Sequence, residues 1–220
     1  MKYFIIAIML MFGLAFAQDA KDLKYSFEHK FFIWKEFVGS PRGKSSSSIG
    51  GTSTQYYKDI VALGVPAVPF IMDKMKDNNE EHLWLAIRII TKKWFKKEEL
   101  EKNNGNYSTL FIKWWDVDFE KTPEIFEGLY SELKELRNKH KEDEVAEKIK
   151  SIQNLGVAAI PCAIKKIEAG DLTLIPVLEY LTDGGISVTK IESLDVEKKI
   201  AFCSRWWNMN KSSWTLSKQK

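Results

Sequence analysis

Side chains suited to metal binding or nucleophilic chemistry are few in this sequence. Its three histidines, His29, His82 and His140, stand far from one another and from both cysteines, so no zinc-site spacing occurs. The sequence also lacks a Gly-x-Ser-x-Gly elbow and a glycine-rich phosphate loop. We therefore predict no catalytic residue, no metal site and no cofactor, and a protein that is not an enzyme.

Tryptophan is the distinctive residue of the chain, which contains eight. Two adjacent pairs lie 92 positions apart. Neighbouring helical side chains point about 100° apart, so we expect that the two rings of a pair do not face the same core. Either the second ring packs on a neighbouring helix, or it lines a groove and anchors a peptide or glycan. The candidate binding residues are Trp114, Trp115, Trp206 and Trp207; the weaker candidates, which have no partner at that spacing, are Trp34, Trp84, Trp94 and Trp214.

Apolar residues recur at spacings of three and four along most of the chain, and no stretch shows sustained alternation. The sequence therefore predicts an all-α fold. We expect helices at 19–38, 55–63, 66–77, 80–95, 109–115, from 122 onward, and at 143–155, 158–169, 173–181 and 195–209. We expect loops or irregular segments at 39–54, at about 96–107 and at 186–194. The predicted inward face of the helix that starts at Thr122 comprises Ile125, Phe126, Leu129, Leu133 and Leu136.

An internal repeat organises these elements. Residues 58–77 and 150–169 are identical at eight of 20 positions, and both contain a Leu-Gly-Val-x-Ala-x-Pro core. Further on, Thr91 corresponds to Thr182, and the first tryptophan pair corresponds to the second. We predict two copies of one helical unit, at about 20–117 and 122–214, which stack on a shared core within a single domain at 18–220.

The repeat gives a common meaning to the two cysteines. Cys162 aligns with Phe70 and Cys203 with Phe111, so the cysteines should be neighbours if those phenylalanines touch. A disulfide between them would stabilise the fold by about 4 kcal/mol in the chain-entropy model. The alternative is two buried free thiols that pack as small apolar groups.

The N-terminus has the features of a secretory signal peptide. Lys2 precedes an apolar run from Tyr3 to Leu14, and the small-x-small step Ala15-Phe16-Ala17 leads into polar residues. We predict a signal peptide at 1–17, a secreted or periplasmic protein, and no membrane span after cleavage. The net charge of the whole chain is only +3, which argues against nucleic acid as a partner.

The segments Leu63-Gly64 with Ala67-Val68-Pro69, and Leu155-Gly156 with Ala159-Ile160-Pro161, resemble HEAT (armadillo-type) repeats. The stretch from Leu83 to Thr91, followed later by a tryptophan pair, is similar to bacterial HEAT-like proteins. The resemblance implies stacked helix pairs. The unit here is about 92 residues long instead of about 40, which does not fit a regular, strongly curved solenoid.

Helical-repeat proteins without a cofactor site usually act as binding surfaces. We therefore predict an exported, non-enzymatic scaffold that binds a protein or peptide. Two alternatives stay open: a binder of envelope polysaccharide that uses the tryptophan-lined faces, and an enzyme of unrecognised type.

Overall fold

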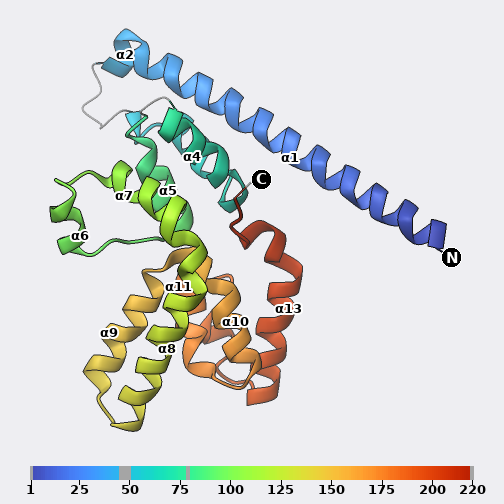
Figure 1. Cartoon of the computed structure of the whole chain (residues 1–220), viewed down its shortest axis with the longest axis vertical. Helices are drawn as coiled ribbons and strands as arrows, with labels where there is room; N and C mark the ends of the chain where they lie inside the picture. Colours follow the sequence, from blue (N-terminus) through green and yellow to red (C-terminus); the bar gives the residue numbers. More distant parts are fainter. Residues whose placement is uncertain (1, 45–50, 78–79, 219–220) are drawn as a thin grey trace.

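The protein is all-helical over the residues that its structure, a computed structural model, describes: 2–44, 51–77 and 80–218, with side chains from residue 20 onward. No strand occurs in these ranges. The helices form two groups that lie one above the other along the long axis of the molecule (Figure 1). The all-α prediction is confirmed.

The first group of helices covers the chain up to residue 121. Its elements are α1 (Lys2–Gly39), α2 (Pro41–Lys44), α3 (Gln55–Val61), η2 (Val65–Ala67), α4 (Val68–Asp77), α5 (Leu83–Thr91), α6 (Lys97–Lys102), α7 (Tyr107–Lys113), the π-helical turn η3 (Trp114–Asp118) and η4 (Phe119–Lys121). We call this group the upper half, after its place in Figure 1.

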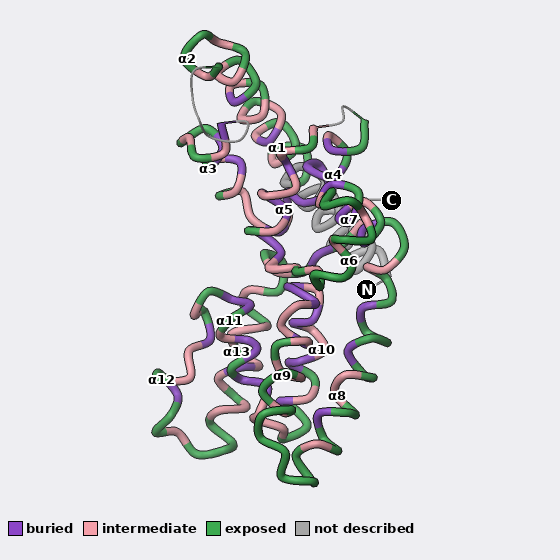
Figure 2. The backbone as a smooth tube through the Cα atoms, turned by 90° about the vertical axis from the view of Figure 1, so that its left-hand side faces the viewer, coloured by how far each residue is buried: buried purple, intermediate pink, exposed green. Residues whose placement is uncertain are grey.

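The second group, the lower half, covers the rest. Its elements are α8 (Thr122–Asn138), α9 (Glu142–Gln153), η5 (Gly156–Ala159), α10 (Ile160–Glu168), η6 (Leu172–Leu174), α11 (Ile175–Leu181), α12 (Val188–Ile191) and α13 (Val196–Trp214). Buried residues run through both halves along the tube of Figure 2, and they form one continuous cluster.

The two halves use the same order of packing. Helix α1 packs on α3, which packs on α5; α4 packs on α5 and on α7. In the lower half, α8 packs on α9, which packs on α11; α10 packs on α11 and on α13. The five helices named in each half therefore have corresponding packing neighbours, whereas α2, α6 and α12 have no counterpart.

The ends of α5 and α11 are built alike by a buried threonine. The Thr91 hydroxyl donates to the carbonyl of Ile87 at 2.7 Å and accepts from the Lys93 N–H at 3.2 Å. The Thr182 hydroxyl donates to Leu178 at 2.7 Å and accepts from the N–H four residues later at 3.1 Å. These bonds satisfy backbone groups where the helix stops.

Several predicted elements need correction. The helix predicted at 80–95 ends at Thr91, because Lys92 takes a left-handed conformation with φ of 56°. The loop predicted at about 96–107 contains α6, whose first turn is capped by the Glu99 carboxylate, which accepts from the Lys96 N–H at 2.7 Å. The segment predicted as irregular at 186–194 contains α12, which buries Ile191.

The N-terminal helix is longer than predicted, since α1 begins at Lys2 and runs without interruption past Ala17. Apolar residues of α1 at spacings of three and four form its inner face: Phe27 and Trp34 are buried, and Leu23, Phe31 and Val38 pack against the core. Part of the loop predicted at 39–54, residues 45–50, lies outside the described residues. In the described part of the chain, no helix has both the length and the apolar character needed to cross a membrane.

The halves meet closely at Gly156. Its φ is +76°, and a Cβ atom built on it would lie 2.4 Å from the Thr91 carbonyl oxygen and 2.9 Å from the Lys93 nitrogen. Beside this contact, the Trp94 N–H donates to the carbonyl of Asn154 at 3.2 Å. The segment after α5 is therefore held against the start of η5, backbone to backbone.

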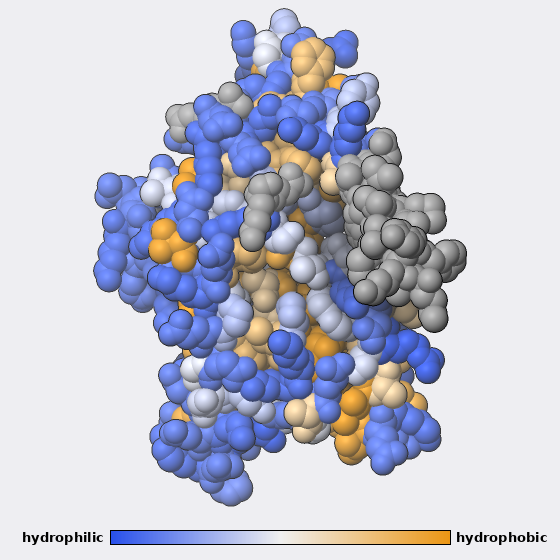
Figure 3. Space-filling model, turned by 45° about the vertical axis from the view of Figure 1, so that its right-hand side comes forward, coloured by the Kyte–Doolittle hydropathy of each residue, from blue (hydrophilic) through white to orange (hydrophobic). Residues whose placement is uncertain are grey.

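The C-terminal tail also joins the halves. After α13, Leu216 is buried, and the Lys218 ammonium lies 3.3 Å from the Glu120 carboxylate and 3.2 Å from the Asp116 carbonyl oxygen. Hydrophilic side chains cover most of the face in Figure 3, and apolar ones gather along its middle.

Candidate functional site

The first predicted binding pair is buried. Trp114 and Trp115 are each 4% exposed and belong to the same core cluster, so the expectation that they face apart was wrong. Both lie in the π-helical turn η3, which does not follow the regular α-helical spacing. Their ring centroids are 6.0 Å apart, and both rings pack on Phe119. Neither ring is available to a ligand in this conformation.

The second pair is half-buried on α13. The ring of Trp206 lies 6.0 Å from that of Trp214. It also covers Gly185, where a Cβ atom would lie 3.0 Å from the indole. Trp207 packs against the core as well. The structure therefore does not bring the four predicted tryptophans together on one open face.

The cysteines are free thiols in the structure, Cys203 buried and Cys162 partly buried. They lie on α13 and α10, two helices that pack against each other. Burial raises the pKa of both thiols, that of Cys203 to about 11. Their pairing as a disulfide after export stays a prediction.

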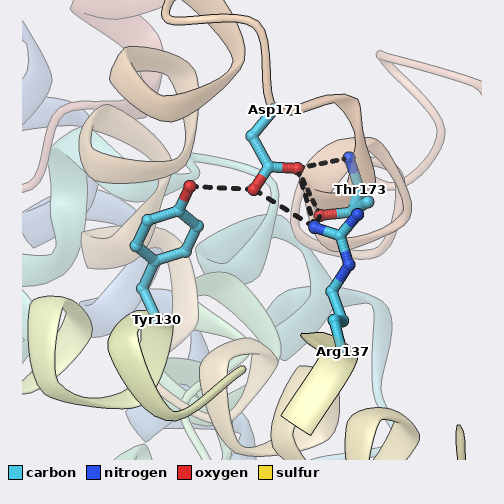
Figure 4. Close-up of polar contacts among 4 residues, drawn as sticks. All are labelled: Tyr130, Arg137, Asp171 and Thr173. Atoms are coloured by element: carbon cyan, nitrogen blue, oxygen red, sulfur yellow. Dashed lines mark hydrogen bonds and ion pairs between the residues drawn. The ribbon is translucent and has the colours of Figure 1, made fainter. Parts of the chain in front are cut away.

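A four-residue polar cluster lies where α8 meets the turn before η6 (Figure 4). The Asp171 carboxylate accepts hydrogen bonds from the Tyr130 hydroxyl at 2.8 Å and from the Thr173 N–H at 3.0 Å. The Arg137 guanidinium lies 3.4 Å from the same carboxylate and donates to the Thr173 hydroxyl at 3.1 Å. The carboxylate thus caps η6 and ties it to α8.

The electrostatics of this cluster follow from its hydrogen bonds. Burial alone would raise the pKa of Asp171, but the bonds from Thr173 and Tyr130 and the charge of Arg137 lower it overall. Burial and the bond to Asp171 raise the pKa of Tyr130 to about 12. These neighbours therefore keep Asp171 ionised and Tyr130 protonated at neutral pH, as a structural anchor requires.

No group of three or more His, Cys, Asp and Glu side chains suited to a metal ion occurs in the described part of the chain. Asp116, whose spacing from Asp118 resembles a metal-binding step, is instead paired with Lys76.

A groove with a largely apolar lining lies at the junction of the halves. One part, of about 380 Å³, lies between the end of α3, the start of η2, the end of α5 and the end of α13. Its lining is mainly apolar and includes Val61, Leu63, Pro66 and Trp214. A second part, of about 360 Å³, is lined by side chains of α5 and α11 together with Trp94.

These two parts form one junction groove, because Ile89, Lys92 and Asp183 line both. The Lys92 ammonium lies 2.9 Å from the Asp183 carboxylate, so an ion pair between the halves crosses the groove.

Three of the exposed large apolar side chains of the described residues lie in this groove. Ile89 is 41% exposed, Trp94 37% and Tyr180 40%, and all three line the second part of the groove. Large apolar side chains with this exposure, gathered on a concave surface, mark an interaction site more often than isolated ones do.

An arginine is stacked among these aromatic rings. The Arg88 guanidinium carbon lies 3.4 Å from the ring centroid of Trp94 and 6.0 Å from that of Trp84. Trp84 in turn stacks on Tyr107, with centroids 4.3 Å apart. The side chain of Arg88 is therefore held in place at the groove wall.

The sequence analysis did not single out this site. Trp94 and Trp214 were weaker candidates because they lack repeat partners, yet both line the groove. A usable signal was the spacing of Trp84 and Arg88, four positions apart on one helix and therefore on one face.

Comparison with known proteins adds no relative: no family model, no curated protein and no solved structure matches this chain.

Proposed function

We propose that this chain is an exported, non-enzymatic scaffold of HEAT-like helical units that binds a protein or peptide in the junction groove. The observation that carries the proposal is the gathering of Ile89, Trp94 and Tyr180, three exposed large side chains, on the groove walls. Elongated grooves between packed helices suit peptide segments, whose side chains occupy successive apolar subsites.

The repeated architecture supports the first part of this proposal. Five helices of each half have corresponding packing partners, Thr91 and Thr182 each donate to the carbonyl four residues earlier, and Gly64 and Gly156 have positive φ values of 70° and 76°. Two such units bury a joint core and leave a groove where they meet, as stacked repeats do.

Export is supported by the sequence of the first 17 residues. N-terminal sequencing of the protein purified from its native envelope or medium tests it. A chain that begins at Gln18 is expected, whereas a chain that retains Lys2 contradicts cleavage.

Binding fits the groove better than catalysis does. Its lining is mainly apolar, and Lys92 and Asp183 neutralise each other across it. An active site needs ionisable groups that converge on a reacting atom. The polysaccharide alternative relied on four tryptophans that are buried or half-buried, which favours a peptide ligand.

Panning a displayed library of random 12-residue peptides on the full mature chain tests the proposal. We expect enrichment of peptides that bind the wild-type protein. Ile89→Asp should weaken their binding at least about tenfold, because it places a charge within the apolar groove.

The matched control is Ile125→Asp. Ile125 was expected to face the core but is 40% exposed on α8, outside the groove, which is close to the 41% of Ile89. Binding should be unchanged in this variant. Recovery of no binding peptide, or equal losses in both variants, contradicts a peptide site in the groove. A change in tryptophan fluorescence with cell-wall fragments, without peptide binding, supports the polysaccharide alternative instead.

A further inference from the structure

The chemistry of the groove wall depends on Arg88. This residue lies on α5, and its guanidinium is stacked on Trp94, with Trp84 on the same helix face. Stacking on Trp94 occupies one face of the planar group and leaves its N–H donors, which point outward in the plane, free to bind an acceptor. The aromatic neighbours also restrict the side chain, so little conformational entropy is lost when it binds.

The groove also carries an excess of positive charge. Lys92 is paired with Asp183, whereas no acidic side chain in the described residues forms an ion pair with Arg88. The charged lining residues are thus two cations and one carboxylate. A ligand with one carboxylate would neutralise the remaining positive charge of the groove.

The first part of the groove lies next to Arg88, because Ile89, the following residue of α5, lines it. Ile89 and Lys92 belong to both parts, and beyond them the lining is dominated by Val61, Leu63 and Pro66. A ligand whose carboxylate contacts Arg88 therefore places neighbouring groups against apolar side chains.

We infer that the ligand of the junction groove is a peptide segment of a partner protein in which an Asp or Glu stands beside apolar residues. The carboxylate pairs with Arg88, flanked by Trp94 and Tyr180, and an adjacent apolar side chain fills the part lined by α3 and η2. This inference rests on the proposed function and specifies the chemistry of its ligand.

The test uses the peptides recovered from the library and, for each, a version in which Asp or Glu is replaced by Asn or Gln. Each pair is titrated against the wild-type protein, Arg88→Gln and the control Arg205→Gln. Arg205 is an exposed arginine on α13 outside the groove.

We expect every recovered peptide to contain an acidic residue beside an apolar one. The amide versions should bind the wild-type protein and Arg205→Gln about tenfold more weakly than the acids, the usual strength of a charge-assisted hydrogen bond. In Arg88→Gln, acid and amide versions should bind equally, and both weakly.

Two results would overturn the inference while leaving the groove as a peptide site. One is recovery of peptides without acidic residues that Ile89→Asp still weakens. The other is an acid-over-amide preference that persists in Arg88→Gln. If Arg88→Gln does not fold, the acid–amide comparison on the wild-type protein still decides, because equal binding of the two versions contradicts a role for the carboxylate.

Discussion

The contact at Gly156 gives a sharp test of how the two halves are joined. In Gly156→Ala, the new methyl group would lie 2.4 Å from the Thr91 carbonyl oxygen, a distance that Cβ atoms essentially never show. Because the neighbouring atoms are backbone, the halves have to separate by roughly 0.6 Å to reach even 3.0 Å. Gly64→Ala is the matched control, since Gly64 has a similar φ but no atom closer than 3.9 Å.

The magnitude follows from two terms. A non-glycine residue at a positive φ of this kind costs about 1–3 kcal/mol, and both variants carry this term. Overpacking against rigid neighbours costs about 1–3 kcal/mol more, and only Gly156→Ala carries it. Gly156→Ala should therefore be less stable than Gly64→Ala by about 1–3 kcal/mol.

Urea denaturation followed by circular dichroism measures the free energy of unfolding of both variants. In thermal melts the same difference corresponds to roughly 2–4 °C for each kcal/mol in a chain of this length. Equal losses in the two variants, within about 0.5 kcal/mol, would refute the close backbone contact between the halves.

Three further predictions concern stability. Tyr57→Phe should lower the free energy of unfolding by about 1–3 kcal/mol in urea denaturation. The buried Tyr57 hydroxyl accepts from the Ala86 N–H at 2.8 Å and donates to the His82 carbonyl at 2.7 Å, and both bonds are lost in the variant. An unchanged urea midpoint contradicts this role. Asp171 has a lowered pKa in the folded protein, so the folded state binds fewer protons than the unfolded chain and loses stability as the pH falls below about 4. Asp171→Asn should show a shallower acid-induced loss than the wild-type protein, and parallel curves would exclude this contribution. Leu216→Ala should cost about 2–5 kcal/mol, since it empties a buried site at the C-terminal tail; a thermal melt identical to that of the wild-type protein would show that the tail is not docked in solution.

The helical fold and much of the core were predictable because they depend on local periodicity. The stripe that includes Phe27 and Trp34 lies inside, as does the face of α5 that includes Ala86 and Ile87. Periodicity failed where a helix has fewer neighbours than its pattern suggests, so that Ile125 on α8 is exposed. It also failed at short helices such as α6, whose stability depends on a cap rather than on an apolar face.

The candidate groove was harder to predict because it belongs to neither half alone. Alignment of the repeats directed attention to residues that recur, and Trp114 recurs because it fills the core. Trp94 has no counterpart in the repeat, and it lies in the segment after α5 that contacts the other half, where its backbone N–H donates to the Asn154 carbonyl. Residues without a counterpart in the repeat were therefore the better indication of where the two halves meet.

The position of Leu216 has a consequence for the order of folding. Chains generally acquire structure from the N-terminus during synthesis. Here the segment that follows α13 lies against η4 of the upper half through Lys218 and Glu120. The packing of Leu216 must therefore wait until the segment beyond α13 has been made, and a nascent chain that stops before Leu216 leaves apolar surface of the core uncovered.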